Sequence, residues 1–246
     1  QEINEVLRYN AWYDRFLKKE ERMKNTPKKY IALIGDLIDS KKIKNRKEVQ
    51  VQLLDVFDKI QQLYGAQIVS KFTLTVGDEF QALLIPQSCV WKLIDHLSIL
   101  SPSPFRLGLG LGEIITQINP NISLGADGEA YWRARDAIQF VHKDNWGGKS
   151  HILFKGHNDH QDQVINSLIL AGETIKANWS QVQRETFDKL VAIDIYEPDF
   201  TQNEVADRLG ISAQALSKRL ITGNIKIYFQ IRQTLGQLLE DYDDRA

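Results

Sequence analysis

The spacing of hydrophobic residues follows two different periods over roughly the first two thirds of the chain. Apolar runs, three of which end at glycine or proline, predict strands over residues 30–34, 72–76, 80–85, 105–116 and 151–154. Apolar residues at helical spacing predict helices over 45–64, 89–100 and 127–142, the last with Asp127 as its N-cap. The order strand, helix, hairpin, helix, strand, helix, strand is typical of an α/β sandwich with a mixed sheet.

The pattern changes near residue 157. Residues 156–162 are polar and contain glycine, as expected of a domain boundary, and every later apolar pattern has the helical period. We therefore predict an α/β domain over 24–157 and an all-α domain over 158–246.

A helix pair is predicted within the all-α domain, over residues 201–220. Thr201 and Glu204 have the spacing of a capping box, Gly210 supplies a turn, and Ser212 stands where a second helix would begin. The second helix would direct Ala215, Leu216 and Leu220 inward. Its outward residues would be Gln214, Ser217, Lys218 and Arg219.

This layout resembles the helix-turn-helix of bacterial regulators, which implies that the outward residues bind base edges and phosphates of duplex DNA. The alternative is a helical hairpin that serves packing or dimerisation. The predicted helices over 181–196 and 225–240 would complete its core.

The first 22 residues allow two interpretations. They precede Met23, the only methionine, and Lys19-Glu20-Glu21 could be encoded by a ribosome-binding sequence. In that case residues 1–22 are translated upstream sequence and the natural chain begins at Met23. Alternatively, Ile3, Val6, Leu7, Tyr13, Phe16 and Leu17 belong to an amphipathic helix.

Composition narrows the possible partners. The formal net charge is −1, so DNA binding requires a local basic face. The single cysteine, Cys89, excludes an intramolecular disulfide and a cysteine-rich zinc site. No apolar stretch is long enough to cross a membrane and no secretory signal is visible, so we expect a cytoplasmic protein without a membrane partner.

Three carboxylates are candidates for a metal site. Asp36 follows the first strand, and Asp78 and Glu79 lie at the turn of the hairpin. Neighbouring strands would bring these groups together, and the mutual repulsion of the carboxylates would favour a divalent cation such as Mg²⁺. Such a site suits phosphoryl transfer on a nucleotide. Alternatively, Gly77-Asp78 is only a turn and Asp36 only a helix cap.

The strand over 106–112 carries glycine at every second position, which leaves Gly108, Gly110 and Gly112 on one face. Bare backbone permits close approach by a helix or a ligand, and we expect a helix.

Residues 30–140 resemble the class III nucleotidyl cyclase domain, which is related to polymerase palm domains. Residues 34–38 resemble its first metal-binding strand, residues 76–80 its metal-binding hairpin, and residues 106–112 the next strand. Residues 125–133 match the segment of the cyclase family that contains a glycine, an asparagine and the arginine that acts in the transition state. The resemblance therefore implies a catalytic role for Arg133. Leu74 replaces the base-reading lysine and Glu129 the asparagine, which argues against cyclisation.

As a whole the chain resembles the SatD family of bacterial proteins, through Gly35-Asp36, Gly77-Asp78-Glu79-Phe80-Gln81 and Asp127-Gly128-Glu129-Ala130-Tyr131. The leading hypothesis is a homodimeric DNA-binding regulator whose cyclase-like domain binds a nucleotide with Mg²⁺. The alternatives are a metal-dependent nucleotidyl or phosphoryl transferase, and a non-catalytic scaffold.

Overall fold

The computed structural model describes residues 28–39, 45–75, 77–144 and 147–242. Residues 1–22, with their two interpretations, lie outside this part. Five strands form one sheet in the order β2-β3-β1-β4-β5. Its strands are β1 (Tyr30–Leu37), β2 (Ile68–Leu74), β3 (Glu79–Leu84), β4 (Phe105–Gly112) and β5 (Ile152–Lys155). Only the β4–β5 pair is parallel, so the predicted mixed sheet is confirmed.

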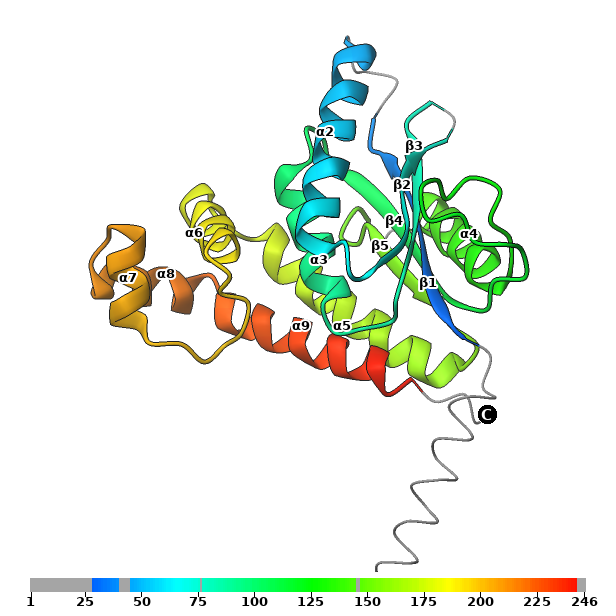
Figure 1. Cartoon of the computed structure of the whole chain (residues 1–246). Coiled ribbons are helices and arrows are strands. Elements are labelled where there is room, and N and C mark those ends of the chain that lie inside the picture. The colour runs from blue at the N-terminus through cyan, green and yellow to red at the C-terminus, as the bar shows by residue number, and fades with distance from the viewer. Residues whose placement is uncertain (1–27, 40–44, 76, 145–146, 243–246) are drawn as a thin grey trace, which may run out of the picture.

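The sheet is covered on both faces (Figure 1). One face packs against α2 (Arg46–Tyr64) and α3 (Val90–Leu100), and this core also includes side chains of α5 (Asp159–Ala177) and α9 (Ile225–Glu240). The other face packs against α4 (Glu129–Lys143). The predicted α/β sandwich is therefore present.

Glycines bring α4 close to β4. A Cβ atom on Gly110 would lie 2.1 Å from the carbonyl oxygen of Ala130, and one on Gly108 would lie 2.2 Å from that of Ala134. Real Cβ atoms do not approach backbone so closely. The glycine face of β4 therefore serves helix packing, as the sequence predicted.

The helical part of the chain contributes to two cores. A small core forms among α6 (Gln181–Ala192), α7 (Gln202–Leu209), α8 (Ala213–Thr222) and α9. It includes Phe187, Tyr228 and Phe229 from these helices, and Trp179 from the segment before α6. In contrast, Ile165 of α5 and Leu235 of α9 belong to the core under the sheet. The predicted 158–246 segment thus divides between the two cores, and α9 extends from one to the other (Figure 1).

The helix starts show which capping predictions were right. Ser212 does cap α8, because its hydroxyl accepts from the amide of Ala215, and Gly210 ends α7 in a left-handed conformation. Thr201 precedes α7 without a side-chain capping bond, so the predicted capping box is wrong. Asp127 is not the N-cap of α4 either: Gly128 has that position, with φ of 147°.

Asp127 instead accepts from the indole N–H of Trp132 at 2.7 Å, which fixes the approach to α4. The strand predicted over 105–116 ends early, at Gly112. Within the described part of the chain, no helix combines the length and apolar character needed to cross a membrane.

Candidate functional site

A row of charged side chains crosses the three inner strands of the sheet near the end of β1. Asp36 is the second-last residue of β1. It is the register partner of Glu79 on β3 and of Arg106 on β4. Directly opposed residues of antiparallel strands point to the same face, so these three side chains lie side by side. Arg106 donates to Asp36 at 2.9 Å.

Helix α4 covers this row with a guanidinium group and an imidazole group. Arg135 grips Glu79 with two guanidinium nitrogens, at 2.5 and 2.9 Å. His142, two helical turns later on the same side of α4, places Nε2 at 2.5 Å from a carboxylate oxygen of Asp36. The carboxylates of Asp36 and Glu79 thus alternate with two guanidinium groups and one imidazole. We call the five residues the charged row: Asp36, Glu79, Arg106, Arg135 and His142.

Asp78 does not join the charged row. It lies at the hairpin tip and forms a 3.6 Å ion pair with Arg46 at the start of α2. The preceding residue, Gly77, has φ of 73°, and its carbonyl accepts from Gln50 of α2 at 2.6 Å. The hairpin tip is thus fastened to α2, while the structure brings Asp36 and Glu79 together under α4.

Electrostatics in the charged row favour the ionised form of Glu79. Burial alone would raise the pKa of Glu79, but the hydrogen bonds and charge of Arg135, with help from Thr75 and His142, hold that pKa below its ordinary value. In the described residues no three acidic, histidine or cysteine side chains converge as a ready-made metal cage. The row offers a cation at most two carboxylates from the protein.

Arg133 lies elsewhere on α4. It donates to the carbonyl of Leu111 at 2.6 Å and pairs with Glu129 of its own helix at 3.1 Å. Leu111 is five residues along β4 from Arg106, a distance of roughly 16 Å. The structure therefore does not bring Arg133 to Asp36 and Glu79. Arg135, for which the sequence indicated no specific role, contacts Glu79 instead.

The four residues predicted to bind DNA all lie on α8, but they differ in exposure. Gln214 and Lys218 are exposed and Ser217 is half-buried. Arg219 is half-buried as well, and one of its guanidinium nitrogens lies 3.4 Å from the hydroxyl of Thr186 on α6. Helices α7 and α8 are joined by the short turn at Gly210 to Ser212.

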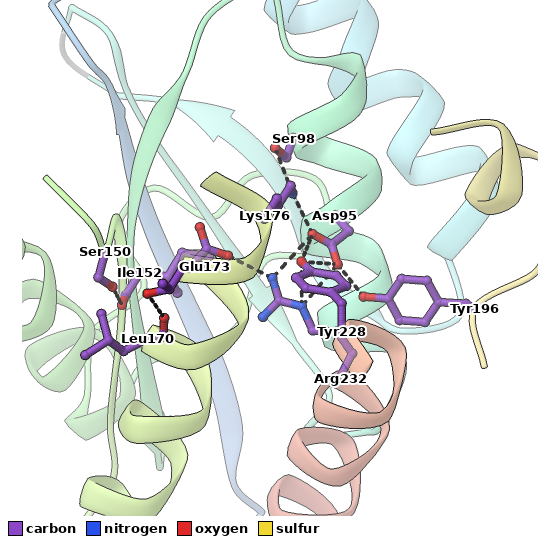
Figure 2. Close-up of polar contacts among 11 residues, drawn as sticks. Asp95, Ser98, Ser150, Ile152, Leu170, Glu173, Lys176, Tyr196, Tyr228 and Arg232 are labelled. Carbon is purple, nitrogen blue, oxygen red and sulfur yellow. Dashed lines mark hydrogen bonds and ion pairs between the residues drawn. The ribbon is translucent and has the colours of Figure 1, made fainter. Parts of the chain in front are cut away.

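A buried ionic network was missed by the sequence reasoning. Asp95 of α3 is fully buried and accepts from Arg232 and Tyr228 of α9, from Lys176 of α5, and from Tyr196 in the segment before α7. Figure 2 shows these side chains converging on the Asp95 carboxylate. An acidic residue within an apolar helix, Leu93-Ile94-Asp95-His96-Leu97, was the available signal.

Burial by itself would raise the pKa of Asp95, but Arg232 and Lys176 and the hydrogen bonds from Lys176 and Tyr196 hold it well below its ordinary value. Arg232 is itself fully buried and also donates to Glu173 at 3.0 Å. The network therefore fastens α9 and the segment before α7 to the helices under the sheet.

The chain combines an α/β sandwich, whose sheet carries the charged row, with a helical segment in which α8 has a polar face. The SatD family model matches residues 30–239, and the chain belongs to the SatD family. A comparison with curated proteins finds no match.

Two solved structures, each described as a bacterial light-regulated adenylyl cyclase, are distantly similar. One has 15% identity and a TM-score of 0.37, over 52% of this chain and 76% of that one. The other has 15% identity and a TM-score of 0.33, over 63% of this chain. This chain spans about half of the latter, 55% of its length.

Proposed function

We propose that this SatD-family protein is a homodimeric DNA-binding regulator that binds a nucleotide with Mg²⁺ at the charged row. The observation that carries the proposal is the cross-strand placement of Asp36 and Glu79, each paired with a cationic or imidazole group from α4. This arrangement supplies both kinds of group that a metal–nucleotide complex requires.

The carboxylates fit magnesium. Mg²⁺ is commonly held by one or two protein carboxylates, with the remaining positions taken by waters and substrate phosphates. Asp36 and Glu79 provide two such groups on one face of the sheet, so they would hold the ion. When bound, the ion would offset the negative charge of the nucleotide phosphates.

The basic groups fit phosphates. A guanidinium donates two parallel hydrogen bonds to a phosphate as readily as to a carboxylate, and Arg135 already makes such a pair with Glu79. We expect Arg106 and Arg135 to turn from the carboxylates to the phosphates when a nucleotide binds. The exchange preserves charge balance, because each carboxylate gains a cation as each arginine gains an anion.

The polar face of α8 supports the DNA-binding part of the proposal. Gln214 and Lys218 are exposed on a helix whose opposite side, Leu216 and Leu220, is buried. Amide and ammonium groups at that spacing can reach base edges and phosphates in a major groove. A second copy in a dimer would present the same helix to a second half-site.

Nucleotide binding is tested by thermal unfolding with nucleoside triphosphates, with and without Mg²⁺, since a ligand that binds the native state raises Tm. We expect a Mg²⁺-dependent rise that is lost in Asp36→Asn and in Glu79→Gln. Asp136→Asn is the matched control, because Asp136 pairs with Lys155 outside the row. No rise with any triphosphate, or equal losses in the control, would contradict the proposal.

Turnover distinguishes the regulator from a transferase. Incubation with labelled triphosphates and Mg²⁺ should give no multiple-turnover product, because Leu74 and Glu129 replace two groups on which cyclase chemistry depends. Sustained product formation that disappeared in Asp36→Asn and Arg135→Ala would instead establish the enzyme. Arg133→Ala would test the catalytic role that the resemblance implies for Arg133.

A further inference from the structure

A cavity of about 400 Å³ lies on the face of the sheet opposite α4, near the start of β4. It is bounded by the end of α3, the loop over 101–104, the start of β5, the end of α5 and the beginning of α6. Its floor includes Phe105 and Ile152, which belong to the core under α2 and α3 and not to the α4 face. Its volume is in the range of small-ligand sites, which often form where two structural units meet.

Hydrogen-bond donors dominate the polar lining of this cavity. Lys149, Lys176 and Arg184 contribute ammonium and guanidinium groups, and Ser98 and Ser103 contribute hydroxyls. His151 also lines the cavity, and its buried Nδ1 atom has no hydrogen-bond partner among the described residues. Burial lowers the pKa of His151. The charge of Glu173 opposes this decrease in part, and Arg106 adds a smaller further decrease.

The two acidic groups of the lining are already engaged. Both oxygens of Asp95 accept hydrogen bonds from the buried network, including one from Lys176 at 2.8 Å. Glu173 accepts from the buried Arg232 at 3.0 Å. Figure 2 shows Lys176 between Asp95 and Ser98 and Glu173 directed toward Arg232. Lys149 and Arg184 therefore lack a carboxylate partner within the cavity lining.

Negative groups near the cavity offset part of this positive charge. The ends of α3 and α5 each carry about half a negative charge, and Arg184 donates to the carbonyl of Lys176 at 3.4 Å. Burial raises the pKa of Asp188, and the nearby charges of Lys176 and Arg184 oppose this rise only in part. Asp188 does not line the cavity. Arg184 has five N–H donors, so it retains several for a ligand. Among the described residues, Lys149 has no hydrogen-bond partner for its ammonium group.

We propose that this cavity binds a small organic phosphate. The phosphate would lie among Lys149, Lys176 and Arg184, where multiple charged donors match its oxygens. An apolar or aromatic part of the ligand would lie on Phe105 and Ile152. The site is separate from the charged row and does not depend on the function proposed for that row.

Isothermal titration calorimetry of the full chain with phenyl phosphate, inorganic phosphate and phenol tests this proposal. We expect phenyl phosphate to bind most tightly, inorganic phosphate more weakly, and phenol not measurably. The double variant Lys149→Ala/Arg184→Ala should lose at least about tenfold in affinity for phenyl phosphate, since it removes two charged hydrogen-bond donors.

Lys143→Ala/Lys189→Ala is the matched control, because it removes the same charge from exposed positions outside the cavity lining, and it should retain affinity within twofold. Ser103→Glu adds a negative charge to the lining and should abolish binding. Asp36→Asn should leave it unchanged, which separates this site from the charged row. Absence of phenyl phosphate binding at millimolar concentration, equal loss in the control, or loss in Asp36→Asn would overturn the proposal.

Discussion

Asp36 and Glu79 occupy opposed register positions on β1 and β3, and each is paired with a side chain from α4, His142 and Arg135 respectively. Two carboxylates so placed would repel each other, and the sequence reasoning assigned their neutralisation to a metal ion. In the structure α4 supplies neutralising groups from within the chain. Any ligand of the charged row must therefore compete with α4, which makes the row a candidate switch.

The strength of this competition can be measured as the coupling between Glu79 and Arg135. We expect a double-mutant cycle with Glu79→Gln and Arg135→Gln to give a coupling free energy below about 1 kcal/mol, because Arg135 is 41% exposed and solvent screens the pair. Urea unfolding at low and high salt provides the measurement. The coupling should decrease as salt rises, and a salt-independent value would contradict the assignment.

The same pair has a defined pH dependence. The pKa of Glu79 is lowered in the folded chain, so its contribution to stability is complete above the ordinary glutamate pKa, about 4.3, and is lost as pH falls through the lower folded value. The coupling measured at pH 7 should therefore persist to about pH 5 and vanish in strong acid. The exposed Lys155–Asp136 pair, at 3.3 Å, is the control and should show little coupling at any pH.

The sheet and its helices could be predicted from the sequence because periodicity is a local signal. The predicted helix over 225–240 matches α9, Ile225–Glu240, and the predicted hairpin became β2 and β3. Ends and caps were less accurate, since Asp127 was assigned the N-cap of α4 when its carboxylate instead binds the Trp132 indole. Whether a polar side chain caps a helix or bonds a neighbour depends on tertiary contacts that its spacing does not determine.

The candidate site was predictable only in part for the same reason. Gly35-Asp36 and Gly77-Asp78-Glu79 indicated that carboxylates would meet, and the β1–β3 register places Asp36 opposite Glu79. The choice between Arg133 and Arg135 depended on how α4 is rotated over β4. That rotation is determined by the contact of Gly108 and Gly110 with the backbone of α4, which no pattern within α4 reveals.

The glycine contact leads to a stability prediction. Gly110→Ala should destabilise the protein by several kcal/mol, because the new Cβ would lie 2.1 Å from a backbone oxygen and α4 would have to move. Gly172→Ala is the matched control: its Cβ would meet no atom closer than 3.6 Å, and alanine favours the helical backbone by about 0.5–1 kcal/mol. Urea unfolding should show loss in the first variant and a small gain in the second.

The DNA-binding hypothesis predicts different behaviour for two neighbouring cations of α8. Lys218→Ala should weaken duplex binding and reduce its salt slope by about one unit, without a change in stability, because Lys218 is exposed. Arg219→Ala should also lower stability, since Arg219 contacts Thr186 of α6. Fluorescence anisotropy with duplex DNA at several salt concentrations, with Lys189→Ala as the control, gives the comparison. If the parent protein binds no duplex at low salt, the regulator hypothesis fails.

The buried network predicts the largest single loss of stability. Asp95→Asn keeps the shape of the side chain but leaves the buried Arg232 and Lys176 without their shared anion. Removal of one partner from a buried ion pair commonly costs about 3–5 kcal/mol. Tyr196→Phe removes only one hydrogen bond to the same carboxylate and should cost about 1 kcal/mol. Urea unfolding at pH 7 should reproduce this order.

Acid titration distinguishes a charge effect from a packing effect in Asp95→Asn. Asp95 has a lowered pKa in the folded chain, so the unfolded chain binds its proton more readily, and its stabilising contribution is complete above about pH 4 and decreases below it. The parent protein should therefore lose stability more steeply below pH 4 than the variant does. Parallel acid profiles would show that Asp95 acts through packing alone.

Local unfolding should then reveal what the network connects. Asp95 on α3 holds Tyr228 on α9 and Tyr196 ahead of α7, so its loss should release the small core around Phe187 and Phe229 before it affects the sheet. We expect hydrogen exchange in Asp95→Asn to accelerate most in α7 and α8, while the strands β1 and β4 remain protected. Equal acceleration in the strands would mean that the two cores unfold as one cooperative unit, and that the network does not control the attachment of the helical part.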